Sequence, residues 1–371
     1  MNNMSFDEFK DAVVANIKDY LPDKYEEADI EIKQVLKNND TMLDGITIRT
    51  PDSNMSPTIY LNNFYEEYEN GKNFDSIVGD IADIHIANAV DQDFNISMVT
   101  DLENAKDNIV PRLVNLEDNK ELLSDRPYQV MDDLAVTYCI QFGESEDGNM
   151  SVGITNALME IYGLTQEELH EIAVANLEEK MPPVLRSMND VIKEMMMPDV
   201  LSMTGGNREE AEQMISEMIP PDEGKMFVLT NENKVNGAAV ILNEKAMDMV
   251  KEQIGDDFFV LPSSVHELLF VKKDECMELS DFENMVQEVN ATQVSKEEKL
   301  SDHVYEYDSQ NKELVRADRA EDREQKQDRS EKSHERVSVK EKIPEMKEKA
   351  AEKVNSVIEK AAEKKKEVAL G

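Results

Sequence analysis

The chain has 371 residues, with 40 basic and 80 acidic side chains, so its formal net charge is −40. Residues 295–371 hold 19 Lys and Arg against 20 Asp and Glu, which leaves 21 against 60, or −39, in residues 1–294. A surface this acidic repels phosphate, which argues against direct binding to nucleic acid or to anionic membranes. No window approaches the roughly 18 consecutive apolar residues of a membrane helix, and the N-terminus has no signal-peptide pattern. We therefore expect a cytoplasmic protein.

The N-terminal quarter predicts a helix, a strand meander and two more helices. Ser5 and Glu8 form a capping-box pattern, and the helix that follows ends before Pro22. Alternating apolar and polar residues predict strands at 28–36, 41–49 and 58–61, followed by helices at 62–68 and 75–90. The last helix is expected to turn four apolar residues inward and its polar ones largely elsewhere: Ile77, Ile81, Ile84 and Val90 against Asp80, Asp83 and His85.

The middle of the chain alternates strands and helices. A strand at 109–115, a short helix up to Leu123 and a strand pair at 134–142 and 150–155 are expected, with the pair joined by the GESEDG turn. A second capping box, Thr165 with Glu168, begins a helix through Glu179. Residues 184–224 are rich in Met and predict helices. Core filling is the expected role of these Met side chains, and an adaptable peptide-binding surface is the alternative.

Residues 226–273 form the segment with the clearest pattern. MFVLTN (226–231) and AAVILN (238–243) are apolar runs joined by a polar, glycine-ended connection, which predicts a hairpin. A helix follows, with Ala246, Val250 and Ile254 on one face, and then strands at 258–261 and 265–271. Another helix is expected at 280–289.

The order of these predicted helices and strands predicts an α+β fold with mixed or antiparallel sheets and packed helices. We expect an acidic globular body at 1–290, with two lobes that meet near Arg126. Residues 291–343 predict a charged, disordered linker, because so few apolar side chains cannot form a core. Residues 344–370 predict an amphipathic helix rich in Ala, Lys and Glu.

The strongest candidate for chemistry is the stretch Pro262-Ser263-Ser264-Val265-His266-Glu267. Ser264 and His266 are the residue types of nucleophilic catalysis, in which His acts as the base. The alternative is a polar strand entry whose Ser and His satisfy exposed backbone groups. The binding surface that this candidate predicts comprises Asn231, Gly237, Pro262, Ser263, Ser264, His266 and Glu267.

Other patterns favour structural interpretations. His266-Glu267 begins like the zinc motif HExxH, but Phe270 stands where the second His is needed. Asp80, Asp83 and His85, and separately His170, are interpreted as solvated helix faces rather than as ligands. Cys139 and Cys276 are expected to be free, buried thiols. We therefore expect no metal site and no cofactor.

Several segments are similar to an uncharacterised bacterial family known only as a domain of unknown function, numbered 5688. The resembling segments are TIYLNNFYEEYENGKNFDSIVGDI, RLVNLEDNKELLSDRP, DLAVTY, ELHEIAVANL, MFVLTN, GAAVIL and VLPSSVHELLFV, spread over residues 1–290. The resemblance implies a shared α+β fold and a bacterial cytoplasmic setting. It implies no activity, so it assigns no functional residue.

Three functions are compatible with these patterns. The preferred hypothesis is a non-catalytic binding or regulatory protein that engages a protein partner through its acidic or Met-rich surface, or through the tail helix. The first alternative is a hydrolase-like enzyme centred on Ser264 and His266, which needs an acid from elsewhere in the chain. The second is an acidic DNA mimic that inhibits a nucleic-acid-binding protein by imitating phosphates with carboxylates.

Overall fold

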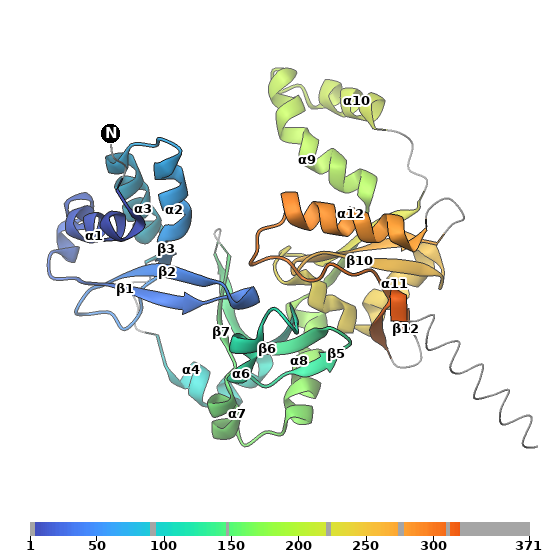
Figure 1. Cartoon of the computed structure of the whole chain (residues 1–371), viewed down its shortest axis with the longest axis horizontal. Helices are drawn as coiled ribbons and strands as arrows, with labels where there is room; N and C mark the ends of the chain where they lie inside the picture. Colours follow the sequence, from blue (N-terminus) through green and yellow to red (C-terminus); the bar gives the residue numbers. More distant parts are fainter. Residues whose placement is uncertain are drawn as a thin grey trace, which may run out of the picture. The chain divides into compact units, whose positions relative to one another are not determined.

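The computed structural model describes residues 4–89, 94–145, 148–219, 224–273, 278–308 and 312–319. The chain divides into two units, Met1–Arg316 and Ala317–Gly371, and the elements below belong to the first. Three antiparallel sheets with packed helices make it an α+β fold, as predicted (Figure 1). The helix expected at 344–370 lies outside the described residues. Within them, no helix combines the length and the apolar character that a membrane crossing requires.

The first sheet belongs to an N-terminal layer with its own core. Ser5 and Glu8 close the first turn of α1 as predicted, since each side chain bonds the other residue's backbone N–H. The sheet order is β1-β2-β3, and α1, α2 and α3 pack together against it (Figure 1). The elements are α1 (Phe6–Asn16), η1 (Ile17–Tyr20), η2 (Asp23–Tyr25), β1 (Asp29–Leu36), η3 (Asn38–Asp40), β2 (Met42–Arg49), β3 (Thr58–Tyr60), α2 (Leu61–Glu69) and α3 (Phe74–Asn88).

The inward face of α3 differs from the prediction. His85 is buried, whereas Ile84 is 39% exposed. The buried positions are Ile77, Val78, Ile81, Ala82 and His85, which recur at spacings of one, three and four residues. Positions at these spacings lie on one side of a helix, and Ile84, seven residues after Ile77, lies at the edge of that side. The apolar pattern alone therefore placed Ile84 inward and His85 outward, and both assignments were wrong. Val90, the last residue of the predicted face, lies outside the described residues.

The second sheet has four strands. Its order is β4-β6-β5, with β7 on β6, and α8 packs on β4. The predicted strands and the helix capped by Thr165 are confirmed; β5 and α7 were not predicted. Cys139 is buried and free as expected, and Cys276 lies outside the described residues. The elements are α4 (Ser97–Thr100), α5 (Leu102–Ala105), η4 (Lys106–Asn108), β4 (Ile109–Asn115), α6 (Lys120–Ser124), β5 (Gln129–Met131), β6 (Leu134–Ser145), β7 (Gly148–Gly153), α7 (Asn156–Tyr162) and α8 (Gln166–Lys180).

The third sheet has six strands in the order β13-β12-β10-β11-β9-β8. It shares one hydrophobic core with the second sheet, so that core contains residues on both sides of Arg126. The body boundary expected at residue 290 falls before β12 and β13, which extend the sheet to Arg316. The elements are β8 (Pro183–Ser187), β9 (Met226–Asn231), η5 (Gly237–Leu242), α11 (Glu244–Ile254), β10 (Phe258–Ser264), β11 (Glu267–Lys272), α12 (Leu279–Thr292), β12 (Tyr305–Asp308) and β13 (Glu313–Arg316).

The predicted hairpin at 226–243 is wrong in its second strand. MFVLTN forms β9, but β9 pairs with β8 and β11. GAAVIL is instead the short helix η5, which Asn236 starts in the left-handed conformation, with φ of 53°. Its first five residues, 237–241, are all buried. An apolar run without polar interruptions fits a buried helix as well as a buried strand, so periodicity could not separate the two.

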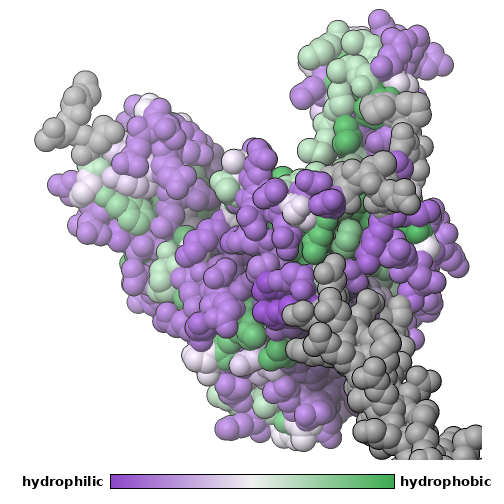
Figure 2. Space-filling view, turned by 45° about the vertical axis from the view of Figure 1, so that its right-hand side comes forward, coloured by the Kyte–Doolittle hydropathy of each residue, from purple (hydrophilic) through white to green (hydrophobic). Residues whose placement is uncertain are grey.

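A Met-rich helical hairpin connects β8 to β9, and we call it the methionine hairpin (residues 188–218). It consists of α9 (Met188–Met203) and α10 (Arg208–Met218), which pack on each other. Its own core contains Val200, Ala211 and Ile215, with partly buried Met side chains beside them. Figure 2 shows pale green, moderately hydrophobic residues on its surface. The expected core-filling role therefore does not describe all of its methionines.

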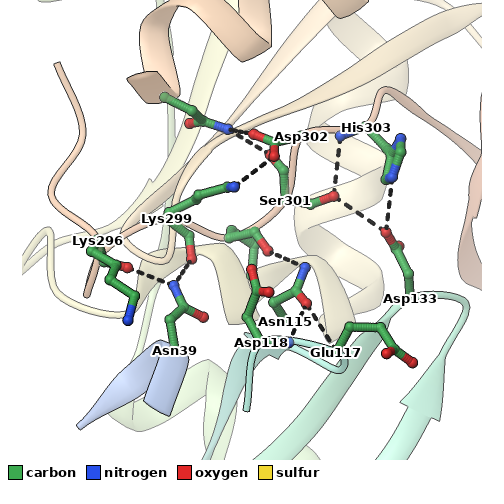
Figure 3. A network of polar contacts seen from close by, with 12 residues as sticks. Asn39, Asn115, Glu117, Asp118, Asp133, Lys296, Lys299, Ser301, Asp302 and His303 are labelled. Atoms are coloured by element: carbon green, nitrogen blue, oxygen red, sulfur yellow. Dashed lines mark hydrogen bonds and ion pairs between the residues drawn. The ribbon is translucent and has the colours of Figure 1, made fainter. Parts of the chain in front are cut away.

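The segment that follows α12 and ends at the first residue of β12 connects all three sheets. We call it the clasp (residues 296–305). Asn39, in the turn between β1 and β2, donates from Nδ2 to the carbonyls of Lys296 at 2.6 Å and Lys299 at 2.7 Å (Figure 3). Asn39 also exchanges two hydrogen bonds with Asn119, next to the second sheet. It is 3% exposed, so these bonds are screened from water and link the first sheet to the other two.

The rest of the clasp is anchored in the larger core. Tyr305 is fully buried and donates its hydroxyl to Asp133 at 2.7 Å. Ser301 donates to the same carboxylate (Figure 3). Asn115 donates to the carbonyl of Leu300 at 3.1 Å. Buried polar groups with partners on separate elements fix the geometry between those elements. A chain that stopped at Asn290 would lack every one of these contacts.

Replacing Asn39 tests whether the clasp holds the layers together. Asn39→Gly removes three side-chain hydrogen bonds and leaves partners unsatisfied, so we expect a loss of about 3 kcal/mol in the free energy of unfolding. Asn39→Ala should cost about 1 kcal/mol more, because Asn39 has a φ of 57° and a Cβ without a polar group disfavours that conformation. Urea denaturation measures both. Asn16→Ala is the control, since exposed Asn16 bonds only Ala12 of its own helix. Equal stability of all four proteins would contradict this role.

Candidate functional site

The residues predicted as a catalytic pair lie at the turn between β10 and β11. β10 ends at Ser264 and β11 begins at Glu267, so Val265 and His266 form the turn. The register between the strands shifts next to Ser264, and the backbone N–H of Val265 donates to the carbonyl of Glu298 in the clasp. The prediction that a strand includes Val265 and His266 is therefore wrong.

Both nitrogens of the His266 ring face other parts of the chain. Nδ1 accepts a hydrogen bond of 3.0 Å from the backbone N–H of Asn236. Because Nδ1 accepts, the neutral ring carries its proton on Nε2. Nε2 lies 3.6 Å from a carboxylate oxygen of Glu298. The imidazole therefore bridges the loop after β9 and the clasp.

The Ser264 hydroxyl takes part in the turn itself. Its oxygen accepts a hydrogen bond of 3.0 Å from the backbone N–H of His266. Ser263 donates to the carboxylate of Glu267 at 3.1 Å, and Pro262 is buried opposite Leu268. A nucleophilic serine needs its hydroxyl to donate to the imidazole of its base. The contacts found here instead close a local side-chain turn, as Ser often does.

A second Ser-x-His sequence in the clasp repeats this geometry. The backbone N–H of His303 donates to the hydroxyl oxygen of Ser301 at 3.1 Å (Figure 3). Ser301 donates to Asp133, and the His303 Nε2 lies 3.9 Å from that same carboxylate. A catalytic triad places the imidazole between the serine and the acid. Here the acid lies between the other two and Ser301 is fully buried, so the arrangement is structural.

The loop from Asn231 to Gly237 is built to receive the β10–β11 turn. Asn231 closes the loop by donating to the carbonyl of Val235 at 2.8 Å and accepting from its N–H at 3.2 Å. Thr230 donates to the carbonyl of His266 at 2.8 Å. A Cβ on Gly237 would lie 2.4 Å from that carbonyl oxygen and 2.3 Å from the Thr230 hydroxyl. Only glycine fits at this contact.

The structure therefore brings Asn231, Gly237, Ser264 and His266 together, as the candidate required. Their hydrogen bonds go to backbone groups and to Glu298 in the clasp, and this joins three segments of the chain. This arrangement agrees with the alternative interpretation, in which the polar residues satisfy backbone groups. The hydrogen bonds of this site hold the loop after β9 against the β10–β11 turn.

A cleft in another part of the described residues includes His170. It has a volume of ≈ 640 Å³ between α8, β5, the start of α11 and the β12–β13 hairpin. His170 is half-buried and its Nδ1 lies 3.1 Å from the hydroxyl of Tyr138. Burial lowers the pKa of His170 and raises the pKa of Tyr138. His170 is therefore partly buried in a cleft wall rather than on a fully solvated helix face.

The wall of this cleft carries balanced charge. Lys245 pairs with Glu178, and Lys312 pairs with Glu244. Apolar Val174 and Leu242 lie between these pairs in the lining. A cleft of this kind holds small molecules in many proteins, but paired charges leave no clear preference for the charge of a ligand. Among the described residues, no cluster of three or more His, Cys, Asp or Glu side chains is placed to hold a metal.

The third histidine of interest, His85, was also expected on a solvated helix face. It is 1% exposed and packs edge-on against Tyr25, with ring centroids 5.1 Å apart. Asp80 is paired with Lys72 at 2.7 Å and Asp83 is exposed, so the three residues do not converge. Burial, together with the nearby Lys24 charge, lowers the pKa of His85. The sequence signal for its burial was its position four residues after Ile81, on a helix face that is otherwise apolar.

Gly237→Ala should destabilise the protein strongly, because the added Cβ would lie 2.3 Å from the Thr230 hydroxyl and also 2.4 and 2.9 Å from two backbone atoms, the His266 oxygen and the Asn231 nitrogen. We expect a loss of about 3 kcal/mol in the free energy of unfolding, at the upper end for overpacking. Gly79→Ala is the matched control. It lies within α3, where a Cβ would meet only Tyr20 at 3.8 Å, and a helical Gly→Ala change should add about 0.5–1 kcal/mol. Chemical denaturation measures both, and the same sign for the two variants would refute this interpretation of the loop.

His85 should make the protein less stable in mild acid. Its folded pKa lies below its unfolded value, which is about 6.5. The unfolded chain therefore binds the extra proton as the pH falls through that value, and stability present at pH 7 is lost. The decline should be shallower in His85→Phe, which keeps the ring contact with Tyr25. Urea denaturation at a series of pH values tests this. The charged groups that line the space beside His85 are Lys24 and Asp52, so identical slopes would assign the effect to them instead.

Comparison with known proteins gives a family and no activity. No curated protein and no solved structure matches the chain. A family model described as "Family of unknown function (DUF5688)" matches residues 6–309. The match begins at the first residue of α1 and ends just after β12, so it includes the first two sheets, the third sheet except β13, and the clasp. The chain therefore belongs to this family of unknown function.

Proposed function

We propose that this protein is a non-catalytic binding protein that engages a basic amphipathic helix of a protein partner through the methionine hairpin. The observation that carries the proposal is the exposure of Met195, Met203 and Met218, which are 73%, 75% and 60% exposed. Only five large hydrophobic side chains in the described residues reach 60% exposure, and these are three of them. Exposed apolar side chains that gather in one element are typical of interaction surfaces.

Methionine suits this role because its side chain is flexible and polarisable. Such side chains can adjust to differently shaped partners, and they are frequent on adaptable binding surfaces. The hairpin itself is also adaptable. Only Val200, Ala211 and Ile215 are buried in its core, and Pro198 removes one backbone donor from α9. A small core and an interrupted helix allow the two helices to shift when a partner binds.

The charge of the hairpin favours a basic partner. Residues 188–218 contain seven acidic side chains and two basic ones, for a net charge of −5. All seven acidic side chains are exposed. Arg208 is paired with Glu212, and Lys193 with Asp190, so most of the remaining surface charge is negative. A helix with one apolar face and Lys or Arg beside it would meet both the methionines and the carboxylates.

The proposal is tested with a labelled peptide that has leucine on one helical face and lysine on the other. Fluorescence anisotropy compares the full chain with the Met195→Gln/Met203→Gln/Met218→Gln variant. We expect the variant to bind at least about tenfold more weakly, since 1.4 kcal/mol of lost burial corresponds to a factor of ten. Met42→Gln/Met285→Gln is the matched control, because Met42 and Met285 are 43% and 38% exposed outside the hairpin.

Two further peptides separate this surface from general attraction to an acidic protein. A peptide with the same leucines and lysines in scrambled order keeps the charge and loses the apolar face, and it should bind weakly. A peptide of leucine and glutamate should not bind. Equal binding of the helical and scrambled peptides, or full binding by the triple variant, would refute the proposal. A chain ending at Arg319 is measured in parallel and should bind as the full chain does.

A further inference from the structure

A cavity of ≈ 200 Å³ opens in the N-terminal layer, beside the C-terminal end of α3. Its most buried lining residues are Tyr25, Ile48 and His85, which are 3%, 2% and 1% exposed. Lys24 and Asp52 line it nearer the surface. A water molecule occupies about 30 Å³, so the cavity has room for about seven waters or for a molecule with about as many non-hydrogen atoms.

The imidazole of His85 is the unexplained group in this cavity. Both of its ring nitrogens are shielded from water, and neither has a hydrogen-bond partner among the described residues. His266 and His170 each have a partner, at 3.0 and 3.1 Å. Burying an imidazole without a partner is unfavourable, and such a group in a native fold indicates a missing partner. The neutral ring offers one N–H donor and one acceptor.

The lining specifies the chemistry of that partner. Lys24 supplies one positive charge and Asp52 one negative charge, and Ile48 and Met55 supply apolar wall. A simple anion would be repelled by Asp52, and a simple cation by Lys24. A molecule that carries one negative and one positive charge can pair with both Lys24 and Asp52.

We propose that this cavity binds a small free α-amino acid with an apolar side chain. Its carboxylate accepts hydrogen bonds from His85 and from the ammonium of Lys24, its ammonium pairs with Asp52, and its side chain packs on Ile48 and Met55. Valine, with eight non-hydrogen atoms, is close to the size that the cavity holds. Because the His85 nitrogens are shielded in the empty cavity, binding requires a wall side chain to move. Met55 is the flexible one in this wall.

The test follows the imidazole itself. The protein is labelled with ¹⁵N-histidine, which gives signals from five residues, and the His85→Phe variant assigns the signal of His85. We expect L-valine to shift the ring nitrogens of His85 in a saturable way and to raise the melting temperature of the wild type. His85→Phe should fold, because it replaces a polar group without a partner by an apolar ring, and it should lose the thermal response to valine.

Two analogues and two variants test the role of each charge. 3-Methylbutanoate lacks the ammonium and 2-methylpropylamine lacks the carboxylate, and each should bind at least tenfold more weakly than valine. Asp52→Asn should weaken the binding of valine tenfold and leave the binding of 3-methylbutanoate unchanged. Glu27→Gln removes an exposed carboxylate of the same layer outside the cavity lining and should bind as the wild type does. The proposal is overturned if valine leaves the His85 signals unchanged, which would indicate water alone, or if an analogue binds as tightly as valine.

Discussion

The arrangement of the three sheets depends on a few amide side chains buried between them. Asn39 contributes most, because one side chain serves two carbonyls of the clasp and the amide of Asn119. Each of these groups would be costly to bury alone. The amides of Asn39 and Asn119 form a network in which every side-chain nitrogen and oxygen has a partner, and such a network specifies one relative placement of the layers more sharply than apolar contact does. The N-terminal layer has its own apolar core, so these polar contacts are what position it on the rest of the unit.

Features determined by near neighbours were predictable from the sequence. The capping boxes at Ser5 and Thr165 are present because their partners lie three residues away. The clasp was not predictable, since Asn39 and Lys296 are separated by 257 positions. Strands β12 and β13 were also missed. Their sequences, YEYD and ELVR, are polar and only four residues long, too short for a period to show. Their burial comes from Tyr305, Leu314 and Val315, which pack under neighbours distant in the sequence.

The candidate site shows the same division. Residue types predicted which side chains would gather, and Asn231, Gly237, Ser264 and His266 do meet. Their roles could not be predicted, because the difference between a nucleophile and a turn lies in which atom donates to which. In both Ser-x-His sequences the serine oxygen accepts from the backbone N–H of the histidine two positions later. The imidazole nitrogens contact other groups: Nδ1 of His266 accepts from the backbone N–H of Asn236, and Nε2 of His303 lies 3.9 Å from the Asp133 carboxylate. The role of His85 could not be predicted from its neighbours in the sequence, because the cavity beside it is lined mainly by residues between Lys24 and Pro57.

The position of the clasp near the end of the ordered sheets has a consequence for synthesis on the ribosome. The N-terminal layer emerges first, but its buried Asn39 must wait for Lys296. At roughly 5–20 residues per second, those 257 residues take about 13–51 s to translate. Near the end of that interval β10 is synthesised, and its edge stays open until β12 follows; open strand edges invite pairing with other chains. The nascent protein therefore completes its assembly only after its last strands have left the ribosome. Loss of this late segment would affect the yield of folded protein before it affected any activity.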